Sequence, residues 1–380
     1  MGTAEETKMS MNVVITNDAV NIAGGENYAL YLAEGLRERN HKVIIAPLKN
    51  SALADEARER KFLVYEIPYG LKGREFNAVK VLYNYLRKEK IDIVHSNSNL
   101  DRTIAAFAGK FIGAKNFTTV HSCLSISRNV THRFRNKFLI DRFTPVGFST
   151  KDILINMDLI PEEKISVVHI GLPPAQFVYS SEGRRKIRNE FSIKDEEILI
   201  GTVSRLVEFK GHSNLINAFK DVSLKNQKLK LLIVGTGELE AELKKQTANF
   251  QLEDKIIFTG NRKDISDILS AIDIFAQTSI DNGGETFPVS ILEAISVGLP
   301  IIASNVGDIK YLVRNENGIL LQPGNVLQIS DSILKLSSNQ SLIEKYKSAS
   351  RKLFENEYTV GRMVNKIESL YLEELKKDVH

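Results

Sequence analysis

Short runs of β-branched and aliphatic residues alternate along this chain with longer segments of helical period. Such alternation is typical of βα units built around a parallel sheet, whose buried strands read as nearly continuous apolar runs. Six runs precede a break in the rhythm and six follow it. They span residues 13–16, 43–46, 91–94, 117–120, 146–148 and 165–168, then 198–203, 231–234, 256–258, 274–276, 301–303 and 319–321. The pattern predicts an α/β protein with two parallel sheets.

The break falls at residues 171–182, where Pro173, Pro174 and two serines interrupt the pattern. A length of 380 residues also favours two domains, because one domain usually takes about 100–200 residues. We therefore expect one domain at 11–172 and a second at 183–355. An amphipathic stretch at about 360–376 has no strand after it, and we expect it to pack back on the first domain.

Composition excludes several classes of protein. Cys123 is the single cysteine, so no intrachain disulfide is possible and a reducing compartment is expected. No apolar run approaches the ~18–20 residues that span a membrane, and the polar start of the chain lacks the apolar core of a signal peptide. We therefore expect a cytoplasmic protein.

The charge is unevenly distributed along the chain. Residues 1–172 hold 24 Lys and Arg against 19 Asp and Glu, and the remainder holds 27 against 28. A basic first half suits an anionic surface or substrate. Nucleic acid is not expected as a partner, because zinc-finger spacing, an RNP-type aromatic run and a dense basic helix are all missing from the sequence.

The first candidate for chemistry is Gly24-Gly25, which follows a predicted strand and opens a helix. Glycines there allow positive φ and close approach of backbone N–H groups to a ligand, and a helix N-terminus favours an anion. A plain βα turn is the alternative. The motif is not G-x-G-x-x-G, which counts against a dehydrogenase.

The second candidate is the pair Arg205 and Lys210, after the strand predicted at 198–203. Open α/β sheets bind ligands at the carboxyl ends of their strands. Both side chains could converge on a diphosphate, Arg through its planar fork and Lys as a point charge. Alternatively, both are solvated loop cations.

The third candidate is the E-x7-E element of Glu285 and Glu293, which joins the loop 281–284 to a helix ending at Gly298. Two carboxylates at this spacing could hold two sets of hydroxyls, and the first-turn amides are free to take a phosphate. Pro288 suits the first helical turn. The alternative is a first-turn glutamate favoured by the helix dipole and an exposed loop glutamate.

Three further positions follow strands in the first half. His121 ends the run 117–120, and His95 ends the run 91–94 and leads to Asn97. A histidine at a strand end is also a common structural residue. The sequence has no H-x-x-x-H, C-x-x-C or acidic-cluster spacing, so we expect no metal.

A basic segment, residues 128–142, carries five Arg and Lys against one acid, with apolar residues interleaved. It is either a helix that lies on a membrane surface or a core-facing helix with a solvated basic face.

Taken together, these positions resemble the retaining GT-B glycosyltransferases of family 4, from Met11 to about Leu375. The resemblance implies two Rossmann-like domains with parallel sheets facing across a cleft, and a C-terminal helix returning to the first domain. The motifs that carry it are Gly24-Gly25-Glu26, Asp92-Ile93-Val94-His95, Thr119-Val120-His121, Val167-Val168-His169-Ile170-Gly171, Arg205-Leu206 with Lys210-Gly211, Val234-Gly235-Thr236-Gly237, Phe258-Thr259-Gly260, Glu285 with Glu293, and Asn317-Gly318-Ile319-Leu320.

The resemblance implies roles for the catalytic group His121, Arg205, Lys210 and Glu285. Arg205 and Lys210 would hold the diphosphate and stabilise its developing charge in place of a metal. Glu285 would contact the donor sugar, and His121 would lie near the reacting carbon. Configuration would be retained, with the departing phosphate taking the acceptor's proton. No protein base is assigned, because the sequence has no carboxylate pair of the hydrolase kind.

The resemblance also implies binding residues. Glu293 would hold the ribose, and the stretch around Arg262 would lie against the base. His95 and Asn97 would lie on the acceptor side. The other donor-binding positions are Gly24, Gly25, Gly235, Gly237, Thr286, Phe287, Pro288 and Val289.

Two residues depart from the family pattern. Pro288 stands where glycine is common and has no N–H to give a phosphate, so Val289 or a later residue would have to supply that contact. Asp308 stands where a second glycine is common, and we expect it to face solvent or the acceptor.

The resemblance implies transfer of a sugar from a nucleotide diphosphate sugar, UDP-linked by default, to a saccharide or lipid-linked acceptor. Neither a cofactor nor a metal is expected. The setting would be bacterial polysaccharide or glycolipid assembly, with the basic segment as a candidate contact to the inner face of the membrane. The alternatives are a nucleotide-sugar epimerase on the same plan and a non-catalytic binding or scaffold subunit.

Overall fold

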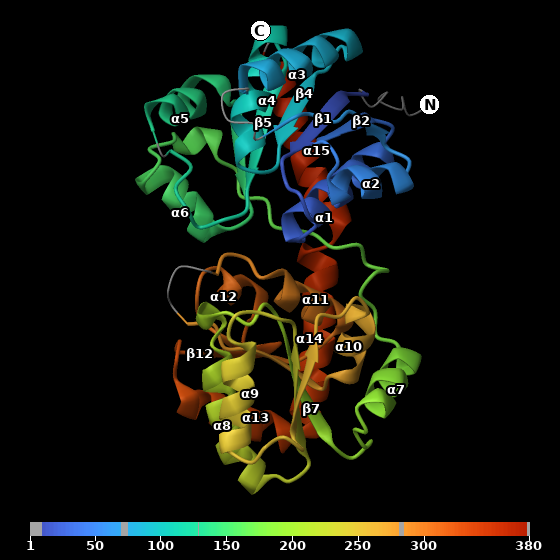
Figure 1. Ribbon diagram of the computed structural model, residues 1–380, viewed down its shortest axis with the longest axis vertical. Coiled ribbons are helices and arrows are strands. Elements are labelled where there is room, and N and C mark those ends of the chain that lie inside the picture. The colour runs from blue at the N-terminus through green and yellow to red at the C-terminus, as the bar shows by residue number, and fades with distance from the viewer. Residues whose placement is uncertain (1–9, 70–74, 128, 281–284, 378–380) are drawn as a thin grey trace, which may run out of the picture. The chain divides into compact units, whose positions relative to one another are not determined.

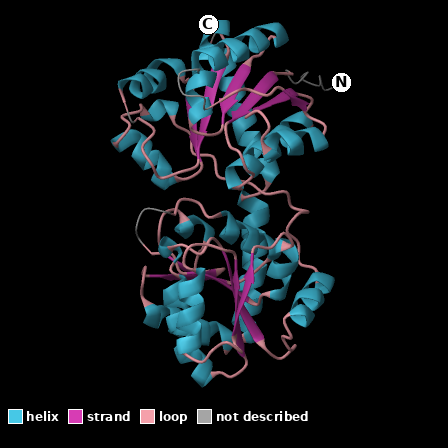
Figure 2. Ribbon diagram, in the orientation of Figure 1, coloured by secondary structure: helices cyan, strands magenta, loops and turns pink. Residues whose placement is uncertain are grey.

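The computed structural model describes residues 10–69, 75–127, 129–280 and 285–377. The chain divides into two compact units, unit 1 (1–171 and 360–380) and unit 2 (172–359). Each unit contains a six-stranded parallel sheet flanked by helices (Figure 2). The α/β architecture with two parallel sheets is therefore confirmed.

The sheet of unit 1 has the strand order β3-β2-β1-β4-β5-β6. Its strand order reverses between β1 and β4, and in open α/β sheets ligands bind at the carboxyl ends beside such a switch point. The strands are β1 (Asn12–Asn17), β2 (Lys42–Pro47), β3 (Leu63–Val64), β4 (Ile93–Ser96), β5 (Lys115–Val120) and β6 (Arg142–Pro145). The helices are α1 (Gly24–Arg37), α2 (Ala52–Glu59), α3 (Glu75–Glu89), α4 (Leu100–Ile112), α5 (Val130–Phe134), α6 (Phe148–Asn156) and α15 (Val360–Lys376), with a π-turn η1 (Arg135–Leu139) and a 3₁₀-turn η2 (Glu162–Lys164).

Two strands predicted for this half are wrong. The sixth strand is Arg142–Pro145 and not 146–148, because Gly147 caps α6, which starts at Phe148. Residues 165–168 form no strand. Ile165 makes a single bridge to Phe143. The short strand β3 was not predicted.

The sheet of unit 2 has the order β12-β11-β10-β7-β8-β9, and all six strands predicted for it are present. They are β7 (Ile198–Val203), β8 (Leu229–Val234), β9 (Ile256–Gly260), β10 (Ile274–Gln277), β11 (Ile301–Ser304) and β12 (Gly318–Leu321). The helices are α7 (Ser181–Glu190), α8 (His212–Lys225), α9 (Glu240–Asn249), α10 (Ile265–Ala271), α11 (Val289–Val297), α12 (Ile309–Leu312), α13 (Val326–Ser337) and α14 (Gln340–Glu357), with a 3₁₀-turn η3 (Glu208–Lys210).

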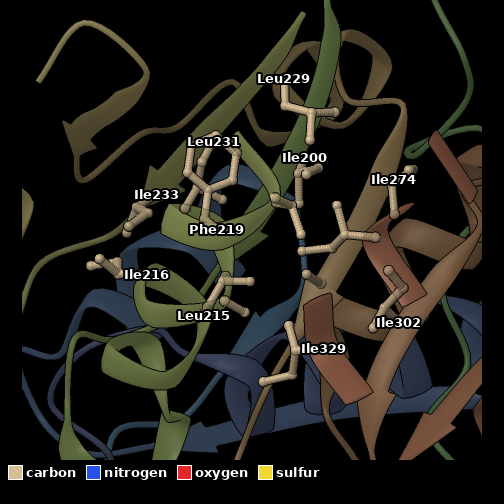
Figure 3. Packing of buried hydrophobic residues seen from close by; sticks show 14 of the residues in the cluster. Ile200, Leu215, Ile216, Phe219, Leu229, Leu231, Ile233, Ile274, Ile302 and Ile329 are labelled. Atoms are coloured by element: carbon tan, nitrogen blue, oxygen red, sulfur yellow. The ribbon is translucent and has the colours of Figure 1, made fainter. Parts of the chain in front are cut away.

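The core of unit 2 explains why its strands read so clearly from the sequence. Ile200 and Leu231 lie on neighbouring strands and pack with Phe219 of α8 and Ile329 of α13 (Figure 3). All four side chains are at most 1% exposed. Burial on this scale favours the aliphatic runs that the sequence shows.

Helix α15 belongs to unit 1 and packs on α1 (Figure 1). A Cβ on Gly35 would lie 2.5 Å from Val364 Cγ2, so glycine allows this close contact between the helices. A buried hydrogen bond and a buried ion pair also hold α15: Glu368 Oε1 is 3.1 Å from His41 Nε2, and Glu374 Oε1 is 2.5 Å from Arg142 Nη2.

The basic segment 128–142 is not one continuous helix. Its helical part is α5 followed by η1, and Arg142 lies in β6. Arg135 and Arg142 are buried, so neither forms part of a solvated basic face, whereas Arg133 and Lys137 are exposed. Arg128 lies outside the described residues. Among the described residues, none of the helices combines the length and apolar character needed to cross a membrane.

Candidate active site

In unit 1, the residues singled out from the sequence gather at the carboxyl ends of β1, β4 and β5. Helix α1 begins at Gly24, and the Glu26 side chain closes its first turn by accepting a hydrogen bond from Ala23 N at 2.9 Å. Neither Gly24 nor Gly25 has a positive φ. The expectation that these glycines permit a left-handed turn is therefore wrong, and what they contribute is the lack of a side chain.

Gly25, Asn97 and His121 are in mutual contact. Asn97 Nδ2 donates to the Gly25 carbonyl at 2.8 Å, and Asn97 Oδ1 lies 3.0 Å from His121 Nε2. A Cβ on Gly25 would lie 3.6 Å from the His121 ring. Because the Asn97 amide group donates to Gly25, its oxygen faces the histidine, and Nε2 of His121 carries the proton.

His121 is neutral in this environment. Burial, with a smaller contribution from the nearby Arg102, lowers its pKa to about 4. Tyr28 packs edge-on against the ring at 5.1 Å. The neutral tautomer with Nε2 protonated leaves Nδ1 as the acceptor nitrogen, so His121 can orient a hydroxyl but does not supply a positive charge at pH 7.

His95 and Asn97 do not lie where acceptor-contacting residues are expected. His95 is fully buried, with Nδ1 2.5 Å from Tyr371 Oη and Nε2 2.7 Å from Thr119 Oγ1. Burial lowers its pKa to about 3. Asn97 is 1% exposed. The structure gives both positioning roles, because His95 ties β4 to α15 and Asn97 holds His121 against Gly25.

In unit 2, the loop after β7 carries Arg205 and Lys210. Arg205 is exposed, and Lys210 ends the turn η3 immediately before Gly211. Gly211 has φ +68°, and a Cβ there would lie 2.0 Å from the Thr278 carbonyl oxygen. Only glycine can adopt this positive φ without strain and also leave room for the carbonyl oxygen, so Gly211 fixes the position of Lys210 relative to β10.

Gly235 and Gly237 pack against the same loop. A Cβ on Gly235 would lie 2.0 Å from the Ser204 carbonyl oxygen, and one on Gly237 would lie 2.3 Å from that of Leu206. Leu206 N–H also donates to Thr236 O at 2.9 Å. Their visible function is therefore to let the loop after β8 support the backbone that presents Arg205.

Lys210 and Glu285 form an ion pair with each other. Lys210 Nζ is 2.7 Å from Glu285 Oε2, and the two side chains are 12% and 7% exposed. The same carboxylate oxygen accepts from Gln277 Nε2 at 2.8 Å and from Ser279 Oγ at 2.9 Å. Three donors therefore fix the orientation of Glu285 at the carboxyl end of β10.

The N-terminus of α11 lies next in the chain. Pro288 is its N-cap, not a first-turn residue, and Val289 is the first helical residue. Thr286 and Phe287 are buried, and the Phe287 ring lies 5.7 Å from that of Tyr358. Within the described part of the chain, the amides of the first turn, 289–291, have no hydrogen-bond acceptor. These N–H groups can receive an anion.

Glu293 lies one turn further into α11. Burial raises the pKa of its carboxyl to about 8, so the group is largely protonated at neutral pH. In the described residues, its side chain has no hydrogen-bond partner. A protonated carboxyl can both donate and accept, which suits a pair of hydroxyls.

Arg262 and Asp308 both have surroundings that bear on their predicted roles. Arg262 is held by Glu190, at 2.5 Å and 2.9 Å, and by Asp264, at 2.9 Å and 2.8 Å, so its guanidinium N–H groups belong to an ion-pair cluster with α7. Contact of the stretch around Arg262 with a nucleotide base stays a prediction. These carboxylates raise the pKa of Arg262. Asp308 is 1% exposed at the start of α12, so the expected orientation towards solvent is wrong, and the alternative orientation towards the acceptor stays a prediction.

Sequence reasoning missed Gln277 and Ser279, which hold Glu285. The available signal was their position, since both are polar residues at the carboxyl end of a predicted strand. The loop 281–284 lies outside the described residues. Among the described residues, no group of three or more His, Cys, Asp or Glu is placed to hold a metal.

Two parallel sheets in separate units, each with polar side chains at the carboxyl ends of its strands, are the architecture of the GT-B class. Two family models together match most of the chain: Glycosyltransferase Family 4 over residues 22–176 and Glycosyl transferases group 1 over residues 183–353. The chain belongs to this family of glycosyltransferases.

Individual relatives agree with this assignment. The chain is 27% identical over 319 residues to the UDP-Gal:alpha-D-GlcNAc-diphosphoundecaprenol alpha-1,3-galactosyltransferase of Escherichia coli, covering 79% of this chain and 80% of that one. It is 23% identical to the N-acetyl-alpha-D-glucosaminyl L-malate synthase of Bacillus anthracis, covering 77% of each.

Solved structures share the fold. The chain matches Anabaena HepE in complex with UDP with a TM-score of 0.85 at 18% identity, covering 96% of this chain and 100% of that one. It matches a glycosyltransferase from Rickettsia africae with a TM-score of 0.83 at 23% identity, covering 97% and 100%.

Proposed function

We propose that this glycosyltransferase transfers the sugar of a UDP-sugar donor to a saccharide or lipid-linked acceptor, with retention of configuration and without a metal. The observation that carries the proposal is the arrangement at the carboxyl edge of the sheet in unit 2. Two cationic side chains, Arg205 and Lys210, occur there together with the first-turn amides of α11 and the anchored carboxylate of Glu285. Cations and free amides suit a diphosphate, and a fixed carboxylate suits sugar hydroxyls.

Lys210 is the residue whose partner changes when donor binds. In the structure, Glu285 Oε2 neutralises the charge of Lys210 Nζ across 2.7 Å. A diphosphate competes for the same ammonium group, and Gln277 and Ser279 keep Glu285 in place when it does. Glu285 then accepts hydrogen bonds from the donor sugar. As the glycosidic bond breaks, Lys210 and Arg205 stabilise the charge that develops on the diphosphate.

His121 orients the acceptor hydroxyl near the reacting carbon in this scheme. It is neutral, because burial lowers its pKa to about 4. The departing phosphate takes the acceptor's proton, so the site needs no protein base. Two relatives support the choice of donor: the name of the Escherichia coli relative specifies UDP-Gal, and HepE was solved with UDP.

The proposed acceptor rests on the Escherichia coli relative, whose name specifies a sugar linked through diphosphate to undecaprenol. Peripheral contact of this chain with the inner face of a membrane is part of the proposal. Phe134 and Phe138 are exposed in the basic segment beside Arg133 and Lys137, and exposed aromatic residues with basic neighbours suit an anionic lipid surface. Binding to anionic vesicles should then weaken as salt is raised. Absence of binding at low salt would contradict this contact.

A thermal-shift panel of UDP, GDP, ADP and their sugars, with EDTA present, tests the donor site. A ligand that binds the native state raises its Tm, and we expect UDP to give the largest rise. A larger rise in Tm with GDP or ADP would show that the donor carries guanosine or adenosine and not uridine. If none of the nucleotides raises the Tm, even with magnesium added, the proposed function is wrong.

A further inference from the structure

A cavity lies in unit 1, and none of the residues that line it is assigned to donor binding. Its volume is about 680 Å³, within the range of sites for small molecules. Its walls come from α3, α4, the loop after β5 and the α5–η1 turn. The proposed function does not use this space.

The walls of the cavity are largely apolar. Along α4, positions 100, 103, 104, 107 and 111 all line it, which is the spacing of one helical face. This stripe extends about 16 Å at 1.5 Å per residue. Phe76 of α3 and Phe111 of α4 are 83% and 67% exposed, and Leu124 is 59% exposed. A cluster of exposed large apolar side chains marks a surface that binds an apolar partner.

Basic side chains accompany the apolar walls. Arg102, His132 and Arg135 line the cavity, and none of its lining residues is acidic. Among the described residues, the guanidinium of Arg102 has one hydrogen-bond partner, Thr118 Oγ1 at 2.8 Å. All three side-chain nitrogens of Arg135 are already bonded. Of the two arginines, Arg102 is therefore the one that remains able to receive an anionic group.

Three carboxylates lie near these arginines, and each accepts hydrogen bonds from other groups. Asp18 accepts from Ser98 Oγ. Asp158 accepts from Ser125 Oγ and from the backbone N–H groups of Ile126 and Ser127. Asp101 accepts from Thr16 Oγ1 at 2.6 Å and from two backbone N–H groups, and burial raises its pKa to about 7. Both oxygens of Asp158 and of Asp101 accept hydrogen bonds, and none of the three carboxylates lines the cavity, so an anionic ligand would meet Arg102.

The cavity starts beside the catalytic edge of unit 1. Ser122 lines it and directly follows His121, and Asn99 lines it two residues after Asn97. From that edge the apolar stripe leads along α4 to Phe111. A molecule whose polar end lies near His121 can therefore place a chain along this helix.

We propose that this cavity holds the apolar chain of an amphiphilic acceptor, with the acceptor's anionic linkage next to Arg102 and its sugar towards His121. The inference rests on the proposed function, because it names the acceptor class of the same site. The occupant is one aliphatic or isoprenoid chain joined to a phosphate group. Such an acceptor matches both features of the cavity, its apolar walls and its basic, acid-free lining.

The test measures binding of hexyl, octyl and dodecyl phosphate to the full chain by titration calorimetry, below their micelle concentrations. Each methylene that enters the cavity should tighten binding by up to about fourfold. Dodecyl phosphate should bind about tenfold more tightly than the uncharged dodecyl maltoside, since a charge-assisted hydrogen bond to Arg102 requires the phosphate.

Matched variants locate the site. Leu124→Asp places a charge in the cavity and should weaken dodecyl phosphate binding about tenfold or more. Leu63→Asp makes the same change at a similarly exposed leucine, 55% against 59%, on the far edge strand β3, and should bind like the wild type. Binding that is independent of chain length, or equal losses in both variants, would overturn the proposal.

The UDP thermal shift of the same variants separates the two proposals. We expect the wild type and Leu124→Asp to respond equally to UDP, because Leu124 has no part in donor binding. If UDP gives no shift while the alkyl phosphates bind as expected, the proposed function fails and the chain-binding cavity stands. If UDP binds and chain length has no effect, the cavity proposal alone is wrong.

Discussion

Lys210 and Glu285 are the residues on which the account depends most. They were expected to contact different parts of the donor, and the structure pairs them with each other across 2.7 Å. Two neutral donors also hold Glu285, so the orientation of its carboxylate does not depend on Lys210 alone. The site is therefore preorganised around one carboxylate.

Lys210→Ala and Glu285→Ala should each lower sugar transfer by about two orders of magnitude or more, because each removes a contact to charge or hydroxyls of the donor. Stability should fall by only about 1–3 kcal/mol, since the partner left behind stays close to solvent or keeps its other donors. Steady-state kinetics and thermal melts check both expectations.

Lys244→Ala is the control, because it breaks an exposed pair with Glu240 in the same unit. It should change neither transfer nor Tm noticeably. Near-normal transfer in Lys210→Ala, or its failure to fold, would contradict the role assigned to that residue.

Glu293 should make stability depend on pH. The pKa of its carboxyl is about 8 in the folded protein against 4.5 as the ordinary value. Between these values the native state binds the extra proton, so the stability of the wild type falls as pH rises through this window. Glu293→Gln cannot ionise and should gain about 1–3 kcal/mol relative to the wild type between pH 5 and pH 8.5, with the partial exposure of Glu293 reducing the full effect. Parallel Tm profiles of the two proteins would contradict the buried, neutral carboxyl.

At this scale, the sequence could predict which residues gather at the strand ends but not their partners. Arg205, Lys210 and Glu285 were placed correctly at carboxyl ends because position relative to a strand is a local property. The burial of His95 depends on Tyr371, 276 residues away, and the saturation of Arg262 depends on Glu190, 72 residues away. Contacts over such separations leave no trace in local spacing.

At the scale of elements, glycines set the loops that carry the site. Gly211 combines a positive φ with a Cβ position 2.0 Å from the Thr278 carbonyl oxygen. Gly113, the C-cap of α4, has φ +79° with open space around it. Both positions have a positive φ, but a Cβ would clash with a neighbouring carbonyl oxygen only at Gly211, so the two glycines form a matched pair.

Gly113→Ala should cost about 1 kcal/mol, the ordinary cost of a left-handed alanine. Gly211→Ala should cost about 3 kcal/mol or more, because the Thr278 backbone must also move, and it should abolish the UDP thermal shift by displacing Lys210. Calorimetric melts of both variants measure the difference. Equal losses of stability in the two variants would show that the backbone around Thr278 accommodates the added Cβ at no cost in free energy.

The strands of unit 2 were predictable because their apolar runs coincide with the sheet. Those of unit 1 were less so. The strand β6 begins at Arg142, a residue type that rarely enters a buried strand, and it is tolerated because Glu374 of α15 neutralises it. The apolar run at 165–168 lies beside β6 and donates two backbone hydrogen bonds to it, from Ser166 N–H and Val168 N–H, but it does not form a strand. In both cases a partner outside the segment decided the outcome.

At the scale of the whole molecule, the chain leaves unit 1 once and returns to it once. Leu172 N–H donates to Tyr358 O at 3.0 Å, and Leu172 bridges Thr359, so the two ends of unit 2 lie together. Unit 1 in contrast needs α15, which supplies partners for His41, His95 and Arg142.

The fragment 172–359 should therefore fold alone and bind UDP, since its sheet, its core and the diphosphate contacts proposed for Arg205, Lys210 and the first turn of α11 are all internal. The fragment 1–171 should lack a cooperative melt, because loss of α15 leaves buried polar groups without partners. Circular dichroism and calorimetric titration with UDP check both fragments. A folded 172–359 that does not bind UDP would show that unit 1 supplies essential donor contacts.

The reaction proposed for this chain is transfer of sugar from a nucleotide sugar by a retaining route that needs no metal. Proton NMR of a UDP-sugar with the enzyme, in the presence of EDTA and with water as the acceptor, tests it. We expect slow release of UDP and of sugar that is first seen in the anomeric configuration it had in the donor. A new nucleotide sugar without free UDP would indicate an epimerase, an inverted first product would exclude retention, and an unchanged spectrum across the UDP-sugars tested would contradict the claim of catalysis.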